Sequence, residues 1–125
     1  FYQSIASQLS PGGVLVANMT SPFTPDDLIS RRVAASLLTA FDEVIVVTPA
    51  SVGWSFAFAG DDLPFDRQML EAALQAHGEV QYTVMDTTAV RAVVGDARPI
   101  TLDSMDFVLQ TSLAWTADNL YGSEQ

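Results

Sequence analysis

Two short valine-rich runs, one on each side of a helical segment, constrain the fold of this chain most. The runs are GVLVANMT, residues 13–20, and EVIVVTP, residues 43–49. Each has the length and β-branched content of a buried strand. Between them TPDD, residues 24–27, predicts the start of a helix, because a capping threonine precedes a proline and two acidic residues. Two strands joined through a helix predict a parallel pair with a right-handed crossover.

A third apolar run, SVGWSFAFAG at residues 51–60, follows the second after a short link. Trp54, Phe56 and Phe58 alternate there with small residues, which is typical of a strand. We predict that Phe56 and Phe58 face the core. The short link allows this strand to run antiparallel to the one before it.

The remaining segments add helices and one more strand. Helical patterns cover residues 1–9 and about 65–77, and EVQYTV at residues 79–84 alternates like a strand. From about Thr87 the pattern predicts a short helix, a turn and a last helix that holds Met105, Leu109 and Leu113. The sequence therefore predicts one α/β domain over residues 1–125, with a mostly parallel sheet, one reversed strand and C-terminal helices.

Composition excludes several classes of function. Fifteen acidic residues stand against five basic ones, all arginine, for a net charge of −10. Nucleic acid would be repelled by this charge, whereas a small cationic ligand would suit it. There is no cysteine, which excludes disulfides and thiolate metal sites. No apolar window is long enough for a bilayer and no secretory signal is recognised, so we expect a cytoplasmic domain without membrane contact.

No complete catalytic or metal-binding motif is present. The glycines of SPGGV, residues 10–14, enter a strand instead of leaving one, so they do not form a dinucleotide-binding turn. No GxSxG elbow occurs. The one histidine, His77, falls in the last turn of a predicted helix, where it favours the helix dipole. The residues alone therefore predict no catalytic, cofactor-binding or metal-binding side chain.

Two places remain as candidate pocket walls. Asn18, Thr20 and Ser21 follow the first apolar run, and ligands of open α/β sheets bind outside the carboxyl ends of strands. Asn and Ser are also common in turns, so this cluster has two interpretations. Trp54 follows Gly53 at the entry to the third strand, where it either walls a pocket or fills the core; composition favours the core.

The order of these segments resembles the C-terminal half of the spermidine synthase family. The match begins with FYQSIASQLSPGGVLVANMTSPF at residues 1–23 and continues, after the helix, with VIVVTPASVGWSFAFAG at residues 44–60 and an acidic turn. In that family an FY helix leads into a GG turn and a strand, and a later WSF segment closes the sheet. The resemblance covers about residues 1–60 and is thin beyond. It implies an aminopropyltransferase on the class I methyltransferase, Rossmann-like fold.

This resemblance implies transfer of an aminopropyl group from decarboxylated S-adenosylmethionine to an amine such as putrescine. The family's glycine-rich loop and catalytic aspartate precede the FY helix, so the resemblance assigns no catalytic or cofactor-binding residue here. We therefore expect a C-terminal fragment of a larger catalytic domain, inactive by itself. On the acceptor side, Asn18 stands where the family has glutamine, and Ser51 and Trp54 match its PSGxWSF segment. These three residues are the candidate amine-binding set.

Two departures from the family pattern leave other functions open. Pro49 replaces a tyrosine whose hydroxyl would contact the amine, and Val52 replaces a glycine. A non-catalytic binding or assembly module, or another class I methyltransferase, therefore remains an alternative. Half of a sheet also leaves an apolar edge uncovered, so we expect the chain to form a homodimer.

Overall fold

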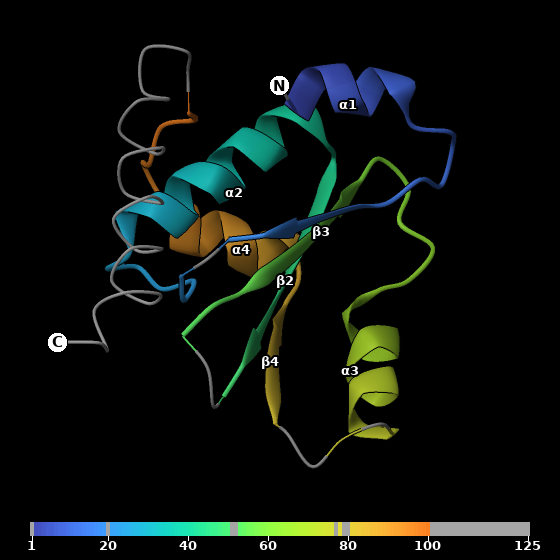
Figure 1. The fold of residues 1–125 in the computed structure, drawn as a ribbon, viewed down its shortest axis with the longest axis vertical. Coiled ribbons are helices and arrows are strands. Elements are labelled where there is room, and N and C mark those ends of the chain that lie inside the picture. Colours follow the sequence, from blue (N-terminus) through green and yellow to red (C-terminus); the bar gives the residue numbers. More distant parts are fainter. Residues whose placement is uncertain (1, 20, 51–52, 77, 79–80, 101–125) are drawn as a thin grey trace, which may run out of the picture.

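The computed structural model describes residues 2–19, 21–50, 53–76, 78 and 81–100, and Figure 1 shows their arrangement. The helices are α1 (Tyr2–Gln8), α2 (Leu28–Ala40), α3 (Arg67–Ala76) and α4 (Thr87–Val94), and the strands are β1 (Leu15–Asn18), β2 (Glu43–Pro49), β3 (Phe56–Gly60) and β4 (Tyr82–Met85). These elements match the predicted segments in order and type. The last predicted helix, with Met105, Leu109 and Leu113, lies outside the described residues. Among those residues no helix is long and apolar enough to cross a bilayer.

The four strands form one sheet in the order β1-β3-β2-β4, and every neighbouring pair is antiparallel. The α/β class is confirmed, but the predicted mostly parallel, Rossmann-like sheet is wrong. β3 pairs with β1 on one edge and with β2 on the other, so Phe56 lies opposite Asn18 and opposite Val47. β1 and β2 consequently point in the same direction without pairing. The physical cause is the short β2–β3 link, which turns β3 back into the place beside β2.

Helices α2 and α4 cover one face of the sheet (Figure 1). α2 begins later than predicted, because residues 24–27 form a turn in which the Asp27 N–H donates to the Thr24 carbonyl oxygen (3.1 Å). Asp27 then caps the helix by accepting from the Ile29 N–H (3.2 Å). Leu37 of α2, Val46 of β2 and Val90 of α4 are fully buried in the cluster that joins these elements.

The opposite face is covered by α3 (Figure 1). Ile45, Val47 and Val84 form a smaller buried cluster there, with Leu70 and Leu74 of α3 packed against it. Phe58 joins this cluster only as a partly buried side chain, and the Phe58 and Phe65 rings meet edge to face (centroids 5.6 Å apart).

The prediction that Phe56 and Phe58 face the core holds for Phe58, which packs on the smaller cluster, but neither phenylalanine is fully buried. Ala57 and Ala59, which alternate with them, are fully buried on the side of α2 and α4, while Phe56 and Phe58 are half-buried. Small alanine side chains let the helical layer approach the sheet closely, so the deepest burial falls on the side with the smaller residues.

Arg31 fastens α2 to the carboxyl end of α4. Its guanidinium donates to the carbonyl oxygens of Val93 (3.1 Å) and Val94 (2.9 Å) and lies 3.2 Å from the Asp96 carboxylate. α4 ends at Gly95, whose φ of 57° is a left-handed conformation that favours glycine. The helical layer is thus held together by polar contacts as well as by its apolar core.

Candidate functional site

A buried serine joins three chain segments at one end of the sheet. The Ser55 hydroxyl is fully buried and accepts a hydrogen bond from the Phe23 N–H (3.0 Å), and its oxygen lies 3.1 Å from the Thr48 hydroxyl. The backbone carbonyl oxygen of Ser55 accepts a hydrogen bond from the Met19 N–H (2.9 Å). These bonds bring the chain after β1, the end of β2 and the beginning of β3 together. Ser55 therefore holds these three segments in place. The sequence did not predict this role, although Ser55 is one of the small residues that alternate with Trp54, Phe56 and Phe58.

Asn18 and Trp54 approach the same half-buried ring at this end of the sheet. Asn18, the last residue of β1, lies directly opposite Phe56 of β3, and directly opposed residues of an antiparallel pair project from the same face. The Trp54 ring packs edge to face on the Phe56 ring, with centroids 4.9 Å apart and planes at 63°. Asn18, Phe56 and Trp54 therefore form one cluster, which we call the strand-end cluster.

Exposure decides between the two interpretations of Trp54. The residue is 37% exposed, so it does not fill the core, and the interpretation that composition favoured is wrong. Asn18 is also exposed. Ser21 turns back on its own chain, its hydroxyl donating to the Met19 carbonyl oxygen (3.3 Å). Ser51 and Thr20 lie outside the described residues.

The strand-end cluster has the chemistry of a binding surface. An amide oxygen accepts hydrogen bonds from an ammonium group, and the face of an indole ring attracts a cation or packs on an alkyl chain. The cluster itself contains no acid or base, and within the described ranges no three His, Asp or Glu side chains gather to hold a metal ion. The chemistry of these side chains is limited to hydrogen bonding and packing.

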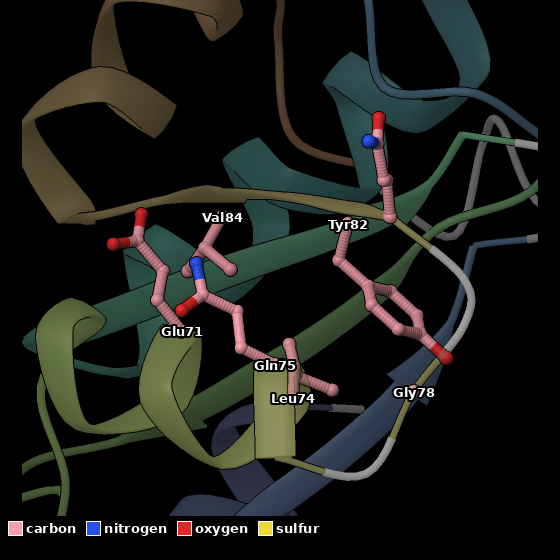
Figure 2. Close-up of a pocket in the computed structure, with 7 residues that line it drawn as sticks. Glu71, Leu74, Gln75, Gly78, Tyr82 and Val84 are labelled. Atoms are coloured by element: carbon pink, nitrogen blue, oxygen red, sulfur yellow. The ribbon is translucent and has the colours of Figure 1, made fainter.

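A hollow lies away from this cluster, between α3 and β4. It is an open groove with a volume of about 560 Å³, lined by Glu71, Leu74, Gln75, Gln81, Tyr82 and Val84, with Gly78 at one end. In Figure 2, Glu71 and Gln75 project from α3, and Tyr82 extends from β4 toward the end of that helix. Neither Asn18 nor Trp54 lines it. Sequence periodicity did not predict this groove, because it does not show which outward side chains of a helix and a strand face one another.

Comparison with known proteins identifies a similar fold. No protein-family model and no curated protein sequence matches the chain. A solved structure, described as a probable spermidine synthase from Corynebacterium glutamicum ATCC 13032, is similar with a TM-score of 0.65 and 20% sequence identity. The match covers 79% of this chain and 38% of that chain, so this chain spans well under half the length of its structural neighbour. This likeness shows a spermidine synthase-like fold.

Two described glycines have left-handed backbone, and neither lies where a glycine-rich co-substrate loop would stand. Left-handed backbone occurs at Gly12, in the turn between α1 and β1, and at Gly95, which ends α4. Neither stands between the carboxyl end of a strand and the beginning of a helix, where phosphates and nucleotides are bound. Neither of these two glycines therefore belongs to a co-substrate-binding loop between a strand and a helix.

Proposed function

We propose that this chain forms the acceptor side of an aminopropyltransferase domain, where an amine is held for alkylation. The observation that carries the proposal is the strand-end cluster, in which Asn18 and Trp54 both neighbour Phe56, on a fold similar to that of a probable spermidine synthase. The net charge of −10 favours the approach of a cationic amine. Ser51 completes the proposed set from outside the described residues.

Each residue would have a role in binding. The Asn18 amide oxygen would accept from the amine, and its reach is one methylene shorter than that of a glutamine. The Trp54 ring would pack along the alkyl chain. Proton removal and the co-substrate would be supplied by a larger domain of which this chain is a part, because the strand-end cluster contains neither acid nor base. The chain alone would therefore bind an amine without alkylating it.

The test uses the full-length protein with decarboxylated S-adenosylmethionine and a panel of di- and polyamines, measuring release of methylthioadenosine. We expect turnover with at least one amine, and Asn18→Ala and Trp54→Ala should raise the KM for that amine more than they lower kcat. Ser7→Ala, an exposed change on α1, is the matched control. Release of no methylthioadenosine with any amine would overturn the proposal.

A second candidate function is a binding or assembly module that keeps the fold without the reaction. Pro49 favours it, because this buried residue of β2 has no hydroxyl to offer an amine. A binding measurement distinguishes both candidates from a protein that binds no amine. Fluorescence of Trp54 in a Trp115→Phe background should respond to amines in either case, whereas turnover should occur only in the enzyme.

The sheet also supports the proposal of a homodimer. β1 is an edge strand: it pairs with β3, and no described strand lies on its other side. Val16 of β1 is 56% exposed. Exposed edges with apolar side chains favour pairing with another strand. Light scattering should therefore give a dimer mass that Val16→Lys lowers to that of a monomer, and a concentration-independent monomer before mutation would contradict this assembly.

A further inference from the structure

The groove between α3 and β4 combines an apolar floor with a rim that attracts positive charge. Leu74 of α3 and Val84 of β4 belong to the apolar cluster on this face of the sheet. The rim carries the Glu71 carboxylate, the Gln75 and Gln81 amides and the Tyr82 ring. Figure 2 shows Glu71 and Tyr82 toward opposite ends of the hollow. A ligand that spans it would therefore meet a carboxylate, an apolar surface and an aromatic ring.

The charge of Glu71 is only weakly compensated. Its carboxylate oxygen lies 3.9 Å from the Arg67 guanidinium one turn earlier, and both side chains are 40% or more exposed. Exposed pairs of this kind contribute little stability. Among the described residues that line the groove, none is basic. An incoming cation can thus replace Arg67 as the partner of Glu71 at small cost.

Tyr82 supplies the second recognition element. It is 38% exposed, so much of its surface is available to a ligand. The face of a tyrosine ring attracts an ammonium group that approaches within about 6 Å. The volume of this open groove, about 560 Å³, lies in the range of small-molecule sites.

We propose that this groove is a binding site for a small organic cation with an apolar body, an aryl- or alkylammonium ion. Its ammonium group would lie at Glu71 or over Tyr82, and its apolar part would cover Leu74 and Val84. The site is separate from the strand-end cluster, and it goes beyond the proposed function because it needs neither Asn18 nor Trp54.

The experiment titrates the full-length protein with phenethylammonium and with its neutral counterpart 2-phenylethanol. Methyl NMR of Leu74 and Val84 reports on the groove, and the Trp54 indole resonance reports on the strand-end cluster. We expect the ammonium to shift both sets of methyl resonances, and to bind more tightly than the alcohol. Rising salt should weaken binding of the ammonium, since the Glu71 contact is exposed. Equal affinity for the two probes, or shifts confined to Trp54, would overturn this site while leaving the proposed function intact.

Matched variants test how much the Glu71 charge and the Tyr82 ring contribute to binding. Glu71→Gln should weaken phenethylammonium by about threefold, whereas Asp26→Asn, which removes one exposed charge in the turn before α2, should leave it unchanged. Tyr82→Leu should weaken it by about threefold and Tyr82→Phe should retain it, because the aromatic face is kept. Equal effects of Glu71→Gln and Asp26→Asn would show that only overall charge matters, and the proposal would fail.

Discussion

The two faces of the sheet differ in what they contribute. On the side of α2 and α4, the buried cluster draws on both helices and on β2 and β3, and Arg31 ties the helices to each other. On the side of α3 the buried cluster has three members, and Val16, Trp54 and Tyr82 remain exposed. Asn18, Phe56 and the α3–β4 groove belong to this second face. Stability is therefore concentrated on one side, and both candidate binding surfaces lie on the other.

The largest effect is expected from a substitution in the core between the sheet and helices α2 and α4. Leu37→Ala removes a fully buried side chain of α2 and should lower the free energy of unfolding by about 3 kcal/mol. Leu74→Ala removes the same atoms from a partly buried site on α3 and should cost about 1 kcal/mol, because less apolar area is lost from the interior. Urea denaturation followed by circular dichroism measures both. Equal losses would contradict the difference between the faces.

The next largest effect is expected at Ser55, which joins the chain after β1 to the end of β2 and the beginning of β3. Ser55→Ala leaves the buried Phe23 N–H without its acceptor and should cost about 2 kcal/mol. Ser7→Ala, whose hydroxyl bonds to the Ser4 carbonyl on the exposed side of α1, is the control and should cost almost nothing. The comparison again uses urea midpoints. A loss for Ser55→Ala as small as that of the control would mean that the hydroxyl does not hold these segments together.

A smaller effect sharpens the assignment of Trp54. Because this residue is 37% exposed, Trp54→Ala should cost about 1 kcal/mol, chiefly the edge-to-face contact with Phe56. The same change should weaken binding of the acceptor amine at the strand-end cluster and leave binding in the α3–β4 groove unchanged. Thermal melts and amine titration together give the measurement, and a loss of stability as large as that of Leu37→Ala would place Trp54 in the core instead.

The smallest effect concerns Tyr2, which packs against the helical cluster. Burial raises the pKa of its hydroxyl, so the folded protein favours the neutral phenol. The unfolded chain ionises first, at about pH 10, and stability is then lost as the pH rises through the folded-state pKa. Tyr2→Phe should therefore lose less stability than the original protein between about pH 8 and pH 11, measured by urea denaturation. Parallel pH profiles for the two would contradict a role for Tyr2 in alkaline unfolding.

Local sequence signals predicted the elements well and the boundaries less well. The valine-rich run of β2 and the alternation of β3 and β4 each gave a strand, and the short helix from Thr87 is confirmed as α4. The beginning of α2 shifted to Leu28, because Asp27 caps the helix and the threonine before it closes a turn. Asn18 and Trp54 were predicted from the sequence. The register of β1 on β3 places Asn18 opposite Phe56, and the Trp54 ring packs on the ring of the same phenylalanine. Their role in binding an amine stays a prediction.

Sequence by itself determined which segments form helices and strands, because hydrophobic periodicity and capping are local properties of the chain. Tertiary structure alone decided the sheet order, in which β3 separates β1 from β2. The short link accounts for the antiparallel pairing of β3 with β2, but the pairing of β3 with the distant β1 depends on tertiary contacts that leave no local pattern in the sequence. Tertiary structure also decided that Ala57 and Ala59, and not the phenylalanines beside them, are the most deeply buried residues of β3. An alternating strand specifies two faces, but which face is covered more closely depends on the helices that pack there.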